Sequence, residues 1–87
     1  MTTLIVEVMT ASGCIRCKRA KALAKKVIAE LDDDRLLYRE VNVIEELDYA
    51  VALGLLSTPA IVLNGEFVFS SLPSAVKLRQ AIFERLG

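Results

Sequence analysis

Two cysteines, Cys14 and Cys17, are the side chains of this 87-residue sequence whose spacing suggests chemistry. They are the only cysteines of the chain and lie in the stretch SGCIRC, with Ile15 and Arg16 between them. Thiols at this spacing can exchange electrons with a disulfide, bind a soft metal ion, or serve as two small apolar side chains in a core. The elements around the pair decide which use is favoured.

The cysteine pair stands where a predicted strand is followed by a predicted helix. Residues 3–9 (TLIVEVM) are β-branched and apolar, which predicts a buried strand, and the small polar residues 10–13 predict a loop. A helix is predicted from about 14 to 31, because apolar side chains recur there at helical spacing. It should end at the aspartates 32–34, which are unfavourable at the negative end of a helix dipole. Its apolar stripe consists of Ala20, Leu23, Ala24, Val27 and Leu31.

This position predicts different roles for the two thiols. Unpaired N–H groups at the helix start, with Arg16 and Lys18 nearby, should lower the pKa of Cys14 below its usual ~8.5. Cys17 lies one turn further on, where burial should keep its pKa higher, and it is close enough to Cys14 to form a disulfide. We expect Cys14 to attack a partner disulfide as the nucleophile and Cys17 to resolve the mixed disulfide.

A second strand and a short helix are predicted next. Residues 36–43 (LLYREVNV) are typical of a strand. Asn42 followed by Glu45 resembles a capping box and predicts the start of a short helix, which Gly54 would end. The strand-helix-strand order up to this point implies a right-handed parallel crossover.

The last third of the chain predicts a hairpin and a final helix. Residues 61–63 and 67–69 flank Asn64–Gly65, a strong signal for a two-residue turn. Pro73 should lie in the first turn of the final helix. The helix is predicted from a serine cap, Ser71 or Ser74, and from the apolar stripe Ala75, Leu78, Ile82 and Leu86. Residues 1–87 are therefore expected to form one α/β domain, in the order β-α-β-α-β-β-α, with a four-stranded mixed sheet and helices on both faces.

The composition argues against several classes of function. Lys and Arg total 11 and Asp and Glu total 11, so the chain lacks the positive charge expected of a nucleic-acid binder. No apolar run approaches the ~20 residues of a membrane span, and the start lacks the basic segment and cleavage site of a signal peptide. We therefore expect a cytoplasmic protein, in which a close cysteine pair is more often catalytic or metal-binding than structural.

A second motif strengthens the redox interpretation. Ser57-Thr58-Pro59 precedes the predicted strand at 60–63, a position that suits a residue without an N–H group. Together with C-x-x-C at a helix start, this Thr-Pro dipeptide resembles the thioredoxin-like superfamily. The resemblance implies that Pro59 is cis and lies against a Cys14–Cys17 disulfide. It also implies that the backbone of Thr58 pairs with the extended chain of a substrate.

The resemblance covers nearly the whole chain and is closest to small bacterial and archaeal thioredoxins of glutaredoxin size. The matching positions are Thr58, Pro59, Asn64, Gly65, Pro73 and Ser74. The chain has no Trp and carries Ile15-Arg16 between its cysteines, so the resemblance assigns no redox potential. Where glutaredoxins hold part of their glutathione site, this sequence reads Ser70-Ser71-Leu72-Pro73. The expected electron donor is therefore a protein reductase.

The strand before the dithiol offers one further candidate. Larger thioredoxins carry a buried aspartate on this strand, and counting back from Cys14 places Val8 at that position, with Glu7 beside it. Glu7 is a candidate proton relay to Cys17. The alternative interpretation, a partly solvated strand carboxylate, is favoured.

Other functions compete with the redox interpretation. Two thiolates suit Cu(I), or half of a zinc site shared by a dimer. The chain could instead be a docking module with idle thiols and a basic helix face (Lys18, Arg19, Lys21, Lys25 and Lys26), or a glutathione-dependent glutaredoxin. We favour a monomeric thiol-disulfide oxidoreductase, a reductant or electron relay, without cofactor or metal. Its expected partners are a protein reductase and disulfide-containing proteins, with no nucleic acid and no membrane.

Overall fold

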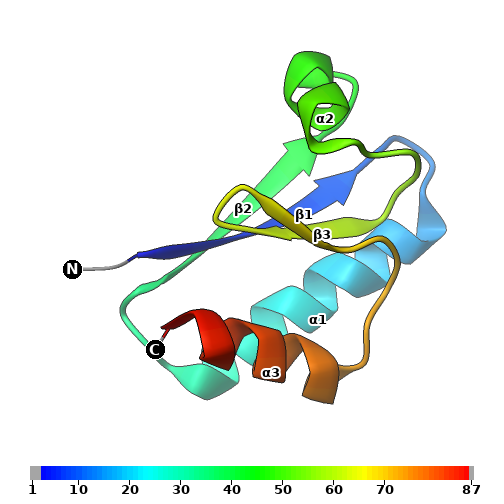
Figure 1. Cartoon of the computed structure of the whole chain (residues 1–87). Helices are drawn as coiled ribbons and strands as arrows, with labels where there is room; N and C mark the ends of the chain where they lie inside the picture. The colour runs from blue at the N-terminus through cyan, green and yellow to red at the C-terminus, as the bar shows by residue number, and fades with distance from the viewer. Residues whose placement is uncertain (1–2, 87) are drawn as a thin grey trace.

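The order of elements predicted from the sequence is confirmed by the computed structural model, which describes residues 3–86. Met1, Thr2 and Gly87, which belong to the predicted domain 1–87, lie outside the described residues. Along the chain the elements are β1 (Leu4–Thr10), α1 (Ile15–Leu31), β2 (Leu36–Asn42), α2 (Leu47–Leu53), β3 (Ala60–Leu63), β4 (Glu66–Phe69) and α3 (Ala75–Leu86) (Figure 1).

The strands form one mixed sheet in the order β2-β1-β3-β4. Strand β1 runs parallel to β2 and antiparallel to β3, while β3 and β4 form an antiparallel hairpin. In the register of the parallel pair, Glu7 lies opposite Arg39 and Val8 opposite Glu40. Strand β1 lies between β2 and β3, and its end at Thr10 leads directly into the loop that carries the cysteines.

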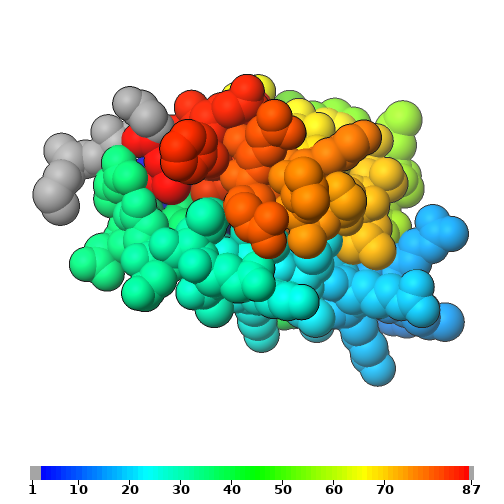
Figure 2. Space-filling model, turned by 90° about the horizontal axis from the view of Figure 1, so that it is seen from below, coloured from blue at the N-terminus to red at the C-terminus, as the bar shows by residue number. Residues whose placement is uncertain are grey.

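Helices cover both faces of the sheet, as predicted. Val6 and Val8 of β1 pack with Ala24 of α1 and Leu78 of α3 in the larger core cluster. Figure 2 shows α1 and α3 lying side by side over this face. The opposite face carries a smaller cluster around Met9, against which α2 packs. Because side chains alternate along a strand, Glu7 and Met9 share the face toward α2.

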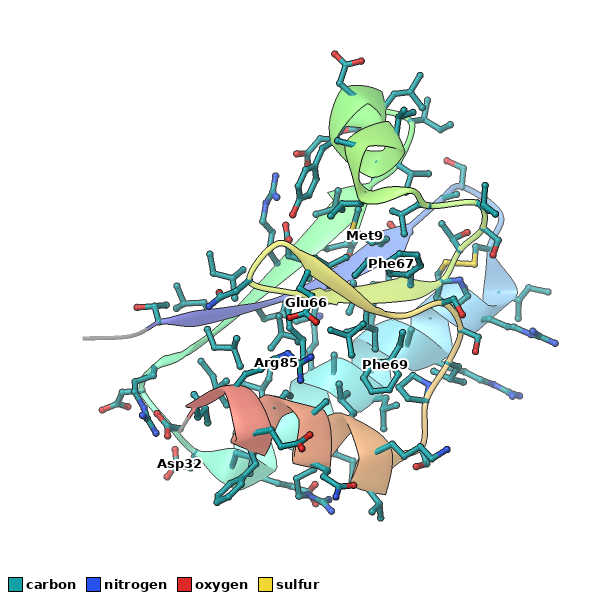
Figure 3. The ribbon with its side chains drawn as sticks, in the orientation of Figure 1. Met9, Asp32, Glu66, Phe67, Phe69 and Arg85 are labelled. Carbon is teal, nitrogen blue, oxygen red and sulfur yellow. A yellow bond between two sulfur atoms is a disulfide. The ribbon has the colours of Figure 1, made fainter. Side chains whose placement is uncertain are left out.

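Figure 3 shows the two sides of the sheet through labelled residues. Met9 and Phe67 lie on the side toward α2 and belong to the smaller cluster. Phe69 lies on the side toward α3 and packs against the larger cluster. Arg85 of α3 reaches the start of β4, where its Nη2 atom lies 3.1 Å from Oε2 of Glu66.

Two helix starts differ from the prediction. The Oδ1 atom of Asn42 accepts hydrogen bonds from the backbone N–H groups of Ile44 (2.9 Å) and Glu45 (3.2 Å). These bonds stabilise a turn over residues 43–46, so α2 begins only at Leu47 and the predicted capping box is wrong. At α3, Oγ of Ser74 accepts from the N–H of Lys77 (3.2 Å). Ser74 is therefore the cap, and Pro73 lies before the helix instead of in its first turn.

The predicted helix ends and the hairpin turn agree with the structure. Asp32 and Gly54 cap α1 and α2 in the left-handed conformation. Asn64 (φ 50°) and Gly65 (φ 79°) also have positive φ, as a two-residue turn requires. The Asn64 side chain accepts from the N–H of Ile5 (2.7 Å) and donates to the carbonyl of Thr3 (3.0 Å). These bonds fix the hairpin turn to the start of β1.

Candidate active site

Cys14 and Cys17 form a disulfide at the N-terminal end of α1. Their Cα atoms are 5.3 Å apart, and Figure 3 shows the sulfur–sulfur bond beside the first turn of the helix. The loop before it contains Gly13 with φ 77°, a conformation that side chains with a Cβ atom rarely adopt. This turn directs the chain from the end of β1 into α1.

The backbone at the helix start points a donor at Cys14. Cys14 is the N-cap of α1, and its backbone is extended (φ −85°, ψ 106°). Its Sγ atom accepts a hydrogen bond from the N–H of Cys17 at 3.2 Å. An N–H group in the first turn of a helix has no partner inside the helix, so it is free to bind a cap. In the reduced protein the same donor would favour a thiolate at Cys14 over a thiol.

The two cysteines differ in exposure. Cys17 is buried, with 2% of its surface exposed, and it lies on the face of α1 that packs against the sheet. Cys14 is only partly buried. A partner molecule can therefore reach Cys14 more easily than Cys17.

Thr58 and Pro59 lie at the same end of the sheet as the dithiol. The peptide bond between them is cis. Pro59 directly precedes Ala60, which pairs with Met9 of β1, and Met9 lies five residues before Cys14 in the sequence. Thr58 is half-buried and Pro59 is buried.

Two cavities of different character lie at this end of the molecule. A polar cleft of about 450 Å³ is lined by both cysteines together with Thr10, Ser12, Lys18, Lys21, Glu40 and Asn42. An apolar pocket of about 210 Å³ is lined mainly by Val43, Leu47, Ala50, Val51, Leu55 and Leu56, and also by Thr58. Ala11 contributes to both cavities. The loop before Cys14 therefore separates a polar from an apolar surface.

The two predicted cationic neighbours of Cys14 occupy different places. Lys18 lines the polar cleft together with both cysteines. Arg16 is exposed and does not line that cleft. The cleft also contains Lys21 and Glu40, which form an ion pair at 3.4 Å. Sequence reasoning did not select this pair, although Lys21 stands four residues after Cys17 and so lies on the same side of the helix.

Glu7 does not face Cys17, so the structure does not bring the two residues of the predicted proton relay together. Its side chain points to the α2 side of the sheet, whereas Cys17 packs on the α1 side. The favoured alternative, a partly solvated carboxylate, is wrong, because only 4% of Glu7 is exposed. Glu7 accepts hydrogen bonds from Nη1 of Arg39 (2.6 Å) and from the hydroxyl of Tyr49. Burial and the bond to Glu7 raise the pKa of Tyr49 to about 12.

The geometry of residues 3–86 bears on whether this part of the chain could hold a metal ion or span a membrane. Within this part of the chain no three His, Cys, Asp or Glu side chains are grouped so that they could hold a metal ion. None of its helices is both long and apolar enough to cross a membrane.

Comparison with known proteins identifies relatives over nearly the whole chain. The thioredoxin domain family model matches residues 4–83. A thioredoxin of Methanocaldococcus jannaschii is 31% identical over 86 residues, which covers 99% of this chain and 100% of the relative. A probable thioredoxin of Methanothermobacter thermautotrophicus is 27% identical over 81 residues, covering 93% of this chain and 94% of the relative. These relatives favour neither metal handling nor a glutathione-dependent glutaredoxin.

Solved structures support the fold independently. Thioredoxin-2 of a malaria parasite has a TM-score of 0.77 at 20% identity, covering 94% of this chain and 82% of that one. A mutant thioredoxin from Halobacterium salinarum has the same TM-score and identity, covering 95% of this chain and 74% of that one. At this identity the likeness concerns the arrangement of helices and strands alone.

Proposed function

Because this chain belongs to the thioredoxin domain family, we propose that Cys14 is the nucleophile and Cys17 the resolving thiol of its disulfide exchange. The family and the C-x-x-C pair make the protein a thiol-disulfide oxidoreductase. The single observation that carries the assignment of roles is the asymmetry of the pair. Cys14 is the more accessible sulfur and accepts the N–H of Cys17, while Cys17 is buried behind it.

The exchange proceeds in two steps that move two electrons. The Cys14 thiolate attacks one sulfur of a substrate disulfide, which breaks the substrate bond and releases one substrate thiolate. The Cys17 thiol then loses its proton and attacks Sγ of Cys14, which releases the second substrate thiolate and forms the Cys14–Cys17 disulfide. The substrate thiolates take up two protons, and a reductase must return two electrons before the next cycle.

Several finer features belong to the same proposal. Thr58 and Pro59 position the substrate, whose extended chain pairs with the backbone of Thr58. Their place at the dithiol end of the sheet, next to an apolar pocket, supports this role. Lys18 and Arg16 add positive charge near Cys14 and favour its thiolate. The physiological partners are a protein reductase and disulfide-containing proteins, and the protein acts as a monomer in the cytoplasm.

Two serine variants test the proposal. The reduced Cys17→Ser variant should accumulate a mixed disulfide between Cys14 and a protein substrate such as insulin, because the resolving thiol is gone. Cys14→Ser should neither form this species nor catalyse insulin reduction. Non-reducing electrophoresis and mass spectrometry of the adduct would distinguish the two. A mixed disulfide on Cys17 in the Cys14→Ser variant, with activity retained, would overturn the assignment.

A further inference from the structure

The side chain of Glu7 is a buried carboxylate that the disulfide exchange does not use. We propose that Glu7 is a positioning residue, which together with Arg39 and Tyr49 fixes α2 and thereby the segment 54–59 that carries Thr58 and Pro59. The inference rests on the proposed function, because it assumes that Thr58 and Pro59 bind the substrate.

The two oxygens of Glu7 join different elements. Oε2 accepts from Nη1 of Arg39 at 2.6 Å, and Arg39 lies opposite Glu7 on β2. Oε1 accepts from the hydroxyl of Tyr49 on α2. Both acceptors of a carboxylate with only 5% of its side chain exposed are therefore occupied by directed donors. Such charge-assisted bonds are stronger than neutral ones and fix the orientation of both partners.

Arg39 extends the connection to the start of α2. Its Nη2 atom donates to Oε1 of Glu46 at 2.5 Å, and Glu46 is the N-cap residue of α2. The guanidinium carbon of Arg39 also lies 6.0 Å from the centre of the Tyr49 ring, within the range of a cation–π contact. One carboxylate and one guanidinium thus hold α2 at two positions, its N-cap and its first turn.

Helix α2 needs such contacts. It has only seven residues, and the Glu46 side chain makes no capping hydrogen bond to the helix. Isolated helices of this length are unstable in water, so tertiary contacts must hold α2 in place. Its apolar contacts to the sheet come from a small cluster that includes Tyr49 and Leu53. The hydrogen bonds that join Glu7 and Arg39 to Tyr49 and Glu46 add directional contacts to this apolar packing.

Helix α2 is joined by a short connection to the segment that carries Thr58 and Pro59, so a shift of the helix should also shift this segment. Gly54 caps α2, and only Leu55, Leu56 and Ser57 separate it from Thr58. Leu55 packs against the same cluster as Tyr49. If α2 moves relative to the sheet, this short connection should change the position of Thr58 and Pro59. The cysteines, which lie at the start of α1, should be unaffected.

The test compares a protein disulfide with a small one. Tyr49→Phe removes the hydroxyl that binds Glu7 but keeps the ring in its cluster. With dithiothreitol as electron donor, and well below the unfolding temperature, we expect the KM for insulin to rise roughly three- to tenfold, within the range that remote contacts transmit. The rate with the small disulfide DTNB, which needs no backbone pairing, should stay unchanged. Glu46→Gln, which weakens only the Arg39 contact, should raise the KM for insulin less.

Matched controls separate positioning from stability and from the proposed function itself. Tyr38→Phe removes the other tyrosine hydroxyl, which is buried without a hydrogen-bond partner, and should leave both reactions unchanged. If Tyr49→Phe lost activity equally with insulin and with DTNB, the inference would be overturned, because the hydroxyl would then have a purely structural role. A normal KM in Tyr49→Phe but a raised KM in Pro59→Ala would overturn the inference alone. If Pro59→Ala also has a normal KM, the substrate-binding role of this segment fails and the inference fails with it.

Discussion

The N–H group of Cys17 donates a hydrogen bond to Sγ of Cys14 at 3.2 Å, so the residue proposed to resolve the exchange also holds the sulfur proposed to begin it. The bond follows from the position of Cys14 as the N-cap of α1. The environment of the Cys14 sulfur therefore depends on the backbone conformation at the start of α1.

This bond predicts an order of alkylation. In the fully reduced protein near neutral pH, iodoacetamide should modify Cys14 well before Cys17, because the helix N-terminus favours a thiolate at Cys14 and Cys17 is buried. Peptide mass spectrometry after short reaction times measures both sites. Equal modification of the two cysteines in the folded protein would contradict the assignment.

Replacing the cations near the dithiol should make the protein more reducing. Lys18→Gln removes a positive charge from the cleft that both cysteines line, which destabilises the reduced, thiolate form and lowers the potential. A shift of about 10 mV is expected for a screened surface charge of a few tenths of a kcal/mol. Arg16→Gln should shift the potential in the same direction, but less, because Arg16 does not line this cleft. Titration in dithiothreitol buffers measures the shift, and Lys26→Gln, an exposed control outside the cleft, should show none.

Asp33 should make stability sensitive to acid. Hydrogen bonds from Arg35 lower the pKa of Asp33 from 3.8 to about 2. A lowered folded-state pKa gives stability that is present above the unfolded value and is lost as the pH falls through the folded value. Urea unfolding between pH 6 and pH 2 (about the range of this titration) should therefore show a steeper loss in the wild type than in Asp33→Asn. Parallel curves for the two proteins would exclude this role.

The hairpin turn should contribute measurably to stability. Asn64→Ala removes two side-chain bonds to the start of β1 and places alanine at φ 50°, so we expect a loss of about 2 kcal/mol. Chemical denaturation measures the loss. DTNB reduction by the folded variant should be unchanged, since the turn lies away from the residues that line the dithiol cleft. A stability equal to that of the wild type would show that water replaces these bonds without cost.

Much of the fold could be predicted because local signals agree with the tertiary arrangement. The Asn64–Gly65 turn, the stop at Asp32 and the apolar stripes of α1 and α3 depend on residues close in sequence. The start of α2 could not be predicted in the same way. Asn42 can cap either a turn or a helix, and only the structure shows that its bonds to residues 44 and 45 close a turn first.

The contacts of Glu7 could not be predicted from the residues that surround it in the sequence. Six of the seven residues of β1 are buried, because helices cover both faces of the strand. The sequence of β1 therefore lacks the alternation of apolar and polar residues that would show which face Glu7 shares. The partners of Glu7, Arg39 and Tyr49, lie 32 and 42 residues away in the sequence. Their contact depends on the register of β1 with β2 and on where α2 packs. The dithiol, by contrast, could be predicted because both cysteines and their donor lie within one turn.

The short spacing of the cysteines also has a thermodynamic consequence. The Cys14–Cys17 bond joins residues with a sequence separation of 3, so it closes a very small loop. A cross-link of this length should restrict the unfolded chain by only about 2 kcal/mol, against about 4.7 kcal/mol for a loop of 100 residues. By the closed cycle of folding and oxidation, loop closure lets folding favour the disulfide over the dithiol by the same amount, about 2 kcal/mol. Loop closure alone therefore gives the folded protein little preference for the disulfide, which suits a carrier that must accept and release electrons repeatedly.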